Sequence, residues 1–167
     1  MKKITIILPI YQLETEDVTM LNNALYSAED FHNDVKILLV CPEKLRVKLE
    51  NLELRQRLDI IPLYNTTPNT DFVSQVNMGI ANCDTEWFSI LEIDDEYKKP
   101  WLSSMDEYMK AYPDVNVFLP IVKEVNVEGK FLGFMNDSLW AYGFSGKQGV
   151  LDNEILLEYQ NYQTREN

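Results

Sequence analysis

The sequence contains few of the residues that form disulfide scaffolds or transition-metal sites. Its 167 residues include two cysteines, Cys41 and Cys83, and one histidine, His32. The two cysteines have no metal-ligand spacing, and a chain of this length buries enough apolar surface to fold without disulfides. We therefore expect free thiols and a cytoplasmic protein, with His32 in a loop.

Positive charge is also scarce. Fifteen Lys and Arg residues stand against 27 Asp and Glu residues, which gives a formal net charge of -12, and the basic residues form no stripe along the chain. A negative charge of this size repels the phosphates of nucleic acids and of anionic lipids. We therefore expect neither nucleic acid nor an anionic membrane surface as a partner.

Long apolar runs are missing as well. No segment reaches the roughly 20 consecutive apolar residues that span a bilayer. Lys2 and Lys3, before the apolar residues 4–8, resemble the start of a signal peptide, but Pro9 and Glu14 interrupt the run and no small-residue cleavage site follows. We therefore predict neither a membrane span nor a signal peptide.

Short apolar runs alternate instead with amphipathic helical patterns. The patterns predict strands at residues 4–9, 35–40, 59–63, 86–91 and 115–122, and helices at residues 16–28, 42–52, 70–80 and 100–109. The first strand is almost entirely apolar, which is typical of a parallel sheet covered on both sides. The remainder has no clean periodicity, although a hairpin around Gly129 and a last helix at residues 152–163 are expected. The pattern predicts one α/β domain over residues 1–167.

The fourth predicted strand ends in a cluster of acids. Residues 87–91 are mostly apolar, and four of the next five residues are carboxylates: Glu92, Asp94, Asp95 and Glu96. Carboxylates this close repel one another, so a fold tolerates them at a strand end mainly where a cation or a basic partner offsets the charge. The cluster predicts a hard-metal or phosphate-metal site. The alternative is a solvated turn before the next helix, whose dipole favours nearby acids.

The ends of the predicted strands carry the chemistry for a ligand. In an open parallel sheet, ligands bind beyond the carboxyl ends of the strands, where the strand order reverses. Those ends are residues 9–12, 41–43, 64–65 and 92–95. Together they offer an aromatic ring to stack on a base, polar groups for hydroxyls, and carboxylates for a divalent ion that holds a diphosphate.

Two stretches of the chain resemble a known family. Residues 4–12, ITIILPIYQ, are similar to an opening strand that ends in Pro, a small residue, Tyr and Asn. Residues 73–95, VSQVNMGIANCDTEWFSILEIDD, are similar to an Asn-x-Gly helix, an acidic turn and a strand that ends in Asp-x-Asp. In this order they resemble the glycosyltransferases of the GT-A fold, in particular family 2, over about residues 3–122.

This resemblance implies both a fold and an activity. The fold is a Rossmann-like α/β architecture with a mostly parallel central sheet flanked by helices. Residues 1–122 would form the nucleotide-binding half, and residues 123–167 a short, irregular acceptor-side annex. The activity is that of a hexosyltransferase-like enzyme, which moves a sugar from a nucleotide-sugar donor to the hydroxyl of a glycan or another acceptor, with inversion. A homo-oligomer or a larger assembly stays open.

Residue roles are implied by the same resemblance. Asp94 would bind Mn²⁺ or Mg²⁺ on the diphosphate, with Glu92 and Asp95 beside it. The residues expected to contact the donor are Pro9, Tyr11, Gln12, Cys41, Asn77 and Glu92. For Asn77 and Gly79 the alternative role is close packing of their helix, which is the preferred interpretation for Gly79.

The catalytic base of the family lies in the acceptor half, near an acidic pair before a helix. Asp152 and Glu154 are the candidates in this chain, with Asp137 as a further choice. Such a carboxylate takes the proton of the acceptor hydroxyl while the nucleoside diphosphate departs from the opposite side of the sugar carbon.

Several positions depart from the family pattern. Cys41 and Pro42 stand where the family carries two acids after the second strand, Gln12 replaces Asn, and Glu92 replaces Asp. Cys and Pro lack the acceptor oxygens that acids provide. A non-catalytic GT-A-like module of a larger assembly is therefore the alternative function. A nucleotidyltransferase ranks third, because no Gly-rich loop with Lys or Arg follows the first strand.

Overall fold

The computed structural model describes residues 2–120, 122–126 and 128–134. The chain divides into two compact units, Met1–Asp106 and Glu107–Asn167, and each is described by itself. The expectation of one domain over the whole chain stays a prediction. The helix expected at residues 152–163 lies outside the described residues.

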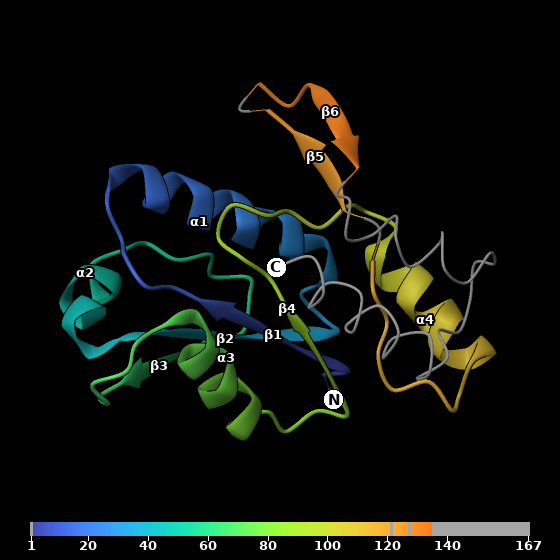
Figure 1. Cartoon of the computed structure of the whole chain (residues 1–167), viewed down its shortest axis with the longest axis horizontal. Coiled ribbons are helices and arrows are strands. Elements are labelled where there is room, and N and C mark those ends of the chain that lie inside the picture. Colours follow the sequence, from blue (N-terminus) through green and yellow to red (C-terminus); the bar gives the residue numbers. More distant parts are fainter. Residues whose placement is uncertain (1, 121, 127, 135–167) are drawn as a thin grey trace, which may run out of the picture. The chain divides into compact units, whose positions relative to one another are not determined.

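The first unit is built on a parallel sheet of four strands (Figure 1). The strands are β1 (Ile4–Pro9), β2 (Val35–Pro42), β3 (Ile60–Asn65) and β4 (Trp87–Ile90), in the order β3-β2-β1-β4. This sheet confirms the expected α/β architecture. Because every neighbouring pair is parallel, the carboxyl ends of all four strands lie at one edge of the sheet.

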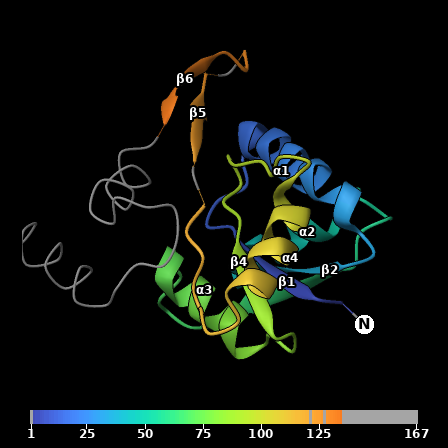
Figure 2. The same ribbon diagram turned by 90° about the vertical axis from the view of Figure 1, so that its right-hand side faces the viewer.

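Helices cover both faces of the sheet, as Figures 1 and 2 show. α1 (Thr15–Ala28) packs on one face and shares a buried cluster with Ile6 of β1. α3 (Phe72–Ala81) packs on the other face, where its Met78 contacts the cluster that contains Ile7. Successive residues of a strand point to opposite faces, so a strand that is covered on both sides is almost entirely apolar. This explains why β1 is buried along its whole length.

The remaining helices are short or lie at the boundary between the units. They are the 3₁₀ turn Glu29–Phe31, the 3₁₀ turn Glu43–Leu45, α2 (Arg46–Glu50) and α4 (Trp101–Ala111). Within the part of the chain that the structure describes, no helix is both long and apolar enough to cross a membrane.

β2 is longer than the sequence predicts, and the helix after it is shorter. β2 continues through Cys41 and Pro42, which pair in register with Tyr64 and Asn65 of β3. The neighbouring strand therefore extends β2 by two residues beyond the predicted end at Val40. The helix predicted at residues 42–52 is consequently reduced to a 3₁₀ turn and the short α2.

The second unit contains the expected hairpin but not the expected fifth strand. β5 (Lys123–Val125) and β6 (Phe131–Phe134) pair antiparallel, and Gly129 between them has a φ of 77°. The strand predicted at residues 115–122 is wrong, because residues 115–120 and 122 belong to neither described sheet. Proline lacks the N–H that a strand ladder needs, and Pro120 lies within this segment.

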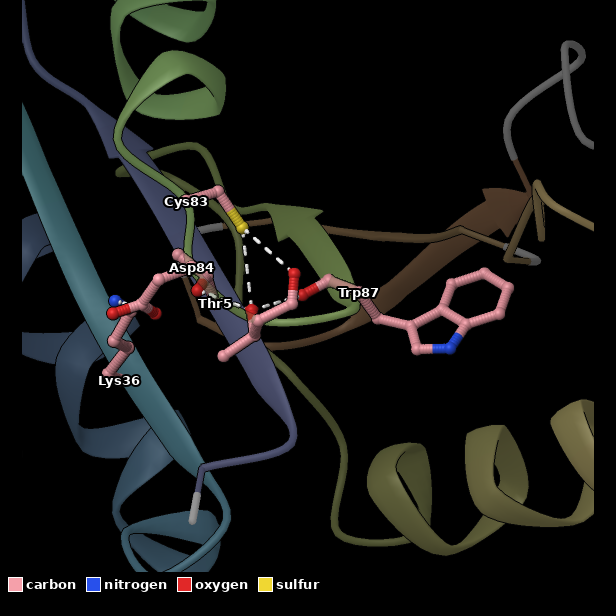
Figure 3. Close-up of polar contacts among 6 residues, drawn as sticks. Thr5, Lys36, Cys83, Asp84 and Trp87 are labelled. Carbon is pink, nitrogen blue, oxygen red and sulfur yellow. Dashed lines mark hydrogen bonds and ion pairs between the residues drawn. The ribbon is translucent and has the colours of Figure 1, made fainter.

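Polar contacts hold the amino ends of the strands, at the edge opposite to the acids (Figure 3). Thr5 Oγ1 and Thr85 Oγ1 are hydrogen-bonded at 2.6 Å, and Thr85 Oγ1 donates to the carbonyl oxygen of Trp87 at 2.7 Å. Lys36 of β2 forms an ion pair with Asp84. These contacts tie Asp84 and Thr85, the residues just before β4, to Lys36 of β2 and Thr5 of β1. They hold the start of β4 against β1, and so help to determine where its acidic end emerges.

Candidate functional site

The strand order reverses between β1 and β4. The chain moves from β1 to β2 and then to β3, and it returns to the other side of β1 to form β4. Residues 10–12 after β1 and residues 91–95 after β4 therefore leave the sheet side by side, and Leu91 N still donates to Ile7 O at 3.0 Å. This is the position at which an open parallel sheet binds its ligand. The structure thus brings together two of the predicted site segments.

The segment after β1 is held from three elements. Gln75 of α3 is fully buried, and its Oε1 accepts a hydrogen bond from Ile10 N at 3.2 Å. Asp17 of α1 is 6% exposed and accepts from Glu14 N at 2.7 Å and from Gln12 Nε2 at 3.4 Å. Lys48 of α2 donates to the carbonyl oxygen of Leu13 at 3.3 Å. The segment is therefore preorganised by the protein itself.

The predicted donor contacts differ in their exposure. Tyr11 is 58% exposed, so its ring is available to a ligand, and Gln12 and Asn77 are also exposed. Pro9 and Cys41 are buried in their strands. Gln75 and Asp17 were missed as site residues. Asp17 carries the signal of an acid in the first turn of a helix, whereas nothing in the sequence around Gln75 distinguishes it.

Residues 92–95 form a turn in which carboxylates crowd one another. Asp95 N donates to Glu92 O at 3.1 Å, and the side chains of Glu92, Asp94 and Asp95 are exposed. Partial desolvation and then the charges of Asp94 and Asp95 raise the pKa of Glu92. Desolvation and then Asp94 raise the pKa of Asp95. Bringing these carboxylates together is therefore unfavourable, and a bound cation would relieve it.

The acidic turn also lines a small hollow against α1. The hollow measures about 40 Å³ and is lined by Met20, Asn23, Ile93, Asp94, Asp95 and Glu96. The solvated-turn alternative relies on the dipole of α4, which begins at Trp101, six residues after Asp95. Helix-dipole effects fall off within the first turn, so this dipole does little for the acids.

The acids of this turn are the right type of ligand for a hard cation, but too few of them are arranged to hold one without other ligands. Carboxylate oxygens are the ligands that Mg²⁺ and Mn²⁺ prefer. The described residues contain no group of three or more His, Cys, Asp or Glu side chains arranged to hold a metal. Mg²⁺ is commonly held by one or two carboxylates together with substrate phosphates and water. One or two carboxylates of this turn, Asp94 with Glu92 or Asp95, would therefore suffice for a cation that arrives with a diphosphate.

The end of β2 offers no acidic side chain to a ligand. Cys41 is 1% exposed, and burial, followed by the charge of Glu43, raises the pKa of its thiol to about 11. Pro42 beside it is also buried. Glu43, the next acid, is occupied by Arg46, whose Nε and Nη2 donate to its two carboxylate oxygens at 2.7 and 2.8 Å. Arg46 in turn lies over the ring of Tyr64, 3.9 Å from its centroid.

The candidate bases cannot be placed in this geometry. Asp152, Glu154 and Asp137 lie outside the described residues. The described part of the site therefore consists of the segment after β1, the ends of β2 and β3, and the acidic turn after β4.

The fold is similar to that of solved structures of S. aureus TarS. The crystal structure of S. aureus TarS 1-349 has a TM-score of 0.53 at 14% identity, covering 77% of this chain and 43% of that one. The same protein in complex with UDP-GlcNAc has a TM-score of 0.53 at 16% identity, covering 73% of this chain and 38% of that one. At such identities the likeness shows the fold, and this chain spans less than half of each of those two chains.

The comparison with family sequence patterns reaches further along the chain. The pattern described as Glycosyl transferase family 2 matches residues 5–160. A comparison with curated proteins found no match. The matched residues include both strand ends of the switch point, the acidic turn and the segment that holds the candidate bases. The chain belongs to glycosyl transferase family 2.

Proposed function

We propose that this chain is a metal-dependent glycosyltransferase that moves a hexosyl group from a nucleoside-diphosphate donor to an acceptor hydroxyl, with inversion. The observation that carries the proposal is the meeting of two segments at the switch point. One is the preorganised segment after β1 with the exposed Tyr11, and the other is the acidic turn of Glu92, Asp94 and Asp95. Membership of family 2 supports the same activity.

The described residues divide the work of donor binding. The exposed ring of Tyr11 stacks on the base, because an aromatic face accepts any nucleobase. Asp94, with Glu92 and Asp95, would hold the divalent cation that accompanies the diphosphate. When bound, the cation stabilises the negative charge that develops on the departing diphosphate. TarS has been solved with UDP-GlcNAc, which makes uridine diphosphate the first nucleotide to test.

The transfer step is a single displacement. The acceptor oxygen forms a bond to the anomeric carbon while the bond from that carbon to the diphosphate oxygen breaks. The electron pair of the broken bond leaves with the nucleoside diphosphate, and the acceptor proton passes to a carboxylate base. Asp152 and Glu154 remain the proposed bases. Attack opposite the leaving group inverts the configuration of the sugar carbon.

Calorimetry with Asp94→Asn tests the proposal. Wild-type protein is titrated with UDP and with GDP, each with Mn²⁺ and each with EDTA. We expect Mn²⁺-dependent binding of one nucleotide, and a loss of at least about tenfold in affinity in Asp94→Asn. Asp30→Asn is the matched control, because Asp30 is an exposed acid in the 3₁₀ turn after α1. Wild-type protein that binds neither nucleotide, or equal binding by both variants, would overturn the proposal.

A non-catalytic module is the second candidate. It is favoured by the buried Cys41 and Pro42, which offer no acceptor where the family carries two acids. The two functions differ in turnover rather than in binding. Release of UDP from a UDP-sugar, in step with appearance of a glycosylated acceptor, would eliminate the module. Tight nucleotide binding without any release of product, over a panel of acceptors, would favour it.

A further inference from the structure

We propose that Gln75 is a positioning residue of the donor site, which couples the segment after β1 to the loop before α3. The inference rests on the proposed function and deepens it. Gln75 has no exposed surface. Its Oε1 accepts from Ile10 N at 3.2 Å, and its Nε2 donates to the carbonyl oxygen of Thr70 at 3.0 Å. One buried amide thus joins two loops that border the switch-point edge.

A buried amide at this position needs a reason. Burying an amide is unfavourable unless its hydrogen bonds are made, and an apolar side chain of the same shape would avoid that penalty. The neighbouring inward-facing residues of α3, Val76 and Gly79, are apolar. Gln75 is therefore the polar exception on the buried face of this helix. The two hydrogen bonds that it makes are both to segments that border the site.

The loop on the far side of Gln75 is itself ordered by a second buried amide. Asn65, at the end of β3, is 5% exposed. Its Nδ2 donates to the carbonyl oxygen of Asn69 at 3.0 Å, and its Oδ1 accepts from Thr67 N at 2.9 Å. Thr70 follows this turn directly and accepts from Gln75. The ends of β3 and β1 are thus connected through Asn65, the turn and Gln75.

The bond from Ile10 to Gln75 is one branch of a shared hydrogen bond. Ile10 N also donates to Val40 O at 2.7 Å, which is the last bond between β1 and β2. Loss of Gln75 therefore leaves the sheet paired but removes the brace between its edge and the loop before α3. The affected residue is Ile10, directly before Tyr11. A positioning role predicts loss of donor affinity without unfolding of the sheet.

Hydrogen exchange of the ligand-free protein tests the brace independently of nucleotide binding. In Gln75→Leu, which keeps the volume but loses both bonds, we expect amides of residues 10–14 and 66–71 to exchange about tenfold faster, the equivalent of one hydrogen bond. The matched control is Asp71→Ala, which removes the N-cap bond from Ser74 N at 2.7 Å but not the brace. It should accelerate exchange at the start of α3 and in the adjoining turn, where Asp71 also contacts Asn69, but leave residues 10–14 as in wild type. Wild-type exchange of residues 10–14 in Gln75→Leu would overturn the proposal.

Gln75→Glu distinguishes a positioning role from a merely structural one through the pH dependence of nucleotide affinity. A protonated carboxyl can accept from Ile10 N and donate to Thr70 O, as the amide does, whereas a carboxylate cannot donate. The quantity to compare is the affinity of Gln75→Glu for UDP with Mn²⁺, divided by the affinity of wild type at the same pH. We expect this ratio to be near one at about pH 5 and to fall about tenfold by about pH 8. The relative affinity of Gln75→Leu should be low and independent of pH.

The two proposals fail in different ways. Wild-type protein that binds neither UDP nor GDP overturns the donor site, and with it the role of Gln75 in that site. A second outcome is that wild type binds nucleotide, but the ratio of the Gln75→Glu affinity to the wild-type affinity does not change with pH. That outcome overturns the positioning role alone. If Gln75→Leu does not fold, Gln75→Glu at low pH retains both hydrogen bonds and still decides the question.

Discussion

A methyl group built on Gly79 of α3 would lie 2.5 Å from Cγ2 of Ile7 in β1. Ile7 is fully buried, so it has no free space into which to move. The close packing that was the preferred role for Gly79 is therefore confirmed. The absence of a side chain brings α3 against the sheet, and with it Gln75 against Ile10.

We expect Gly79→Ala to destabilise the protein. Alanine favours a helix over glycine by about 1 kcal/mol, but overpacking of a buried contact costs about 1–3 kcal/mol. Because a contact of 2.5 Å with the fully buried Ile7 is severe, the cost should lie in the upper part of this range. The net loss in the free energy of unfolding should then be about 1–2 kcal/mol, measured by urea denaturation. Gly133→Ala is the control, because its methyl group would meet only Glu124 Oε2 at 3.9 Å. A Gly79→Ala protein as stable as wild type would contradict the packing described here.

Asp94→Asn should stabilise the metal-free protein while abolishing its response to metal. The pKa values of Glu92 and Asp95 are raised from their ordinary values of 4.5 and 3.8 in the folded protein. When the pH rises above these ordinary values, the folded state therefore keeps more protons bound than the unfolded state does. Stability therefore falls as pH rises through that window toward the raised values. Removing the charge of Asp94 weakens this fall, although desolvation, the larger cause, remains.

The effect can be measured as melting temperature against pH, in EDTA and in Mn²⁺. In EDTA at about pH 7 we expect Asp94→Asn to gain about 0.5 kcal/mol, as is usual for exposed charge pairs. In Mn²⁺ with UDP, wild type should gain stability by mass action and the variant should not. A variant less stable than wild type in EDTA would show that the carboxylates do not repel one another as described.

The ion pair between Lys36 and Asp84 should be asymmetric in its response to mutation (Figure 3). The side chain of Lys36 is 8% exposed and that of Asp84 is 76% exposed. Asp84→Ala leaves a buried ammonium without its partner and should destabilise by about 1–2 kcal/mol, less than for a fully buried pair. Lys36→Met leaves a carboxylate in water and should be nearly neutral.

A double-mutant cycle checks this asymmetry. The protein with both Lys36→Met and Asp84→Ala should be more stable in urea than the protein with Asp84→Ala alone, because the unpaired charge is gone. If Lys36→Met instead proves the more damaging single change, the lysine contributes through packing of its stem rather than through its charge.

The two cysteines should react at different rates with an alkylating agent. Cys41 is buried with a pKa of about 11, so little thiolate forms. Burial also raises the pKa of Cys83, but hydrogen bonding with Thr5 and Thr85 and the charge of Lys36 outweigh it and hold this pKa below its ordinary value. With iodoacetamide at about pH 8, mass spectrometry should find Cys83 modified first and Cys41 only after unfolding. Equal rates in folded protein would contradict the burial of Cys41.

Much of the fold could be predicted because its signals are local. The apolar runs of β1 and β2 and the helical spacing of α1 appear in the sequence at nearly their observed bounds. The fifth strand was wrong for a local and a non-local reason. Residues 115–119 are mostly apolar, but Pro120 cannot donate to a strand ladder, and a strand also needs a neighbour in a sheet, which the described sheets do not provide.

The site shows the same division. The acids after β4 and Tyr11 after β1 were found because each follows an apolar strand. Gln75 and Asp17 were not found as site residues, because their roles depend on partners elsewhere in the structure. Gln75 meets an amide 65 residues away, and Asp17 meets the loop between β1 and α1.

The sequence by itself determined the alternation of strands and helices, the position of the acidic turn and the resemblance to family 2, because periodicity and strand ends are properties of neighbouring residues. Only the tertiary structure decided the strand order β3-β2-β1-β4, which places the acidic turn beside Tyr11. It also decided that the segment after β1, which lies beside the acidic turn, is braced by Gln75. Such contacts join residues distant in the chain, and they exist only once the sheet has paired and α3 has packed against Ile7.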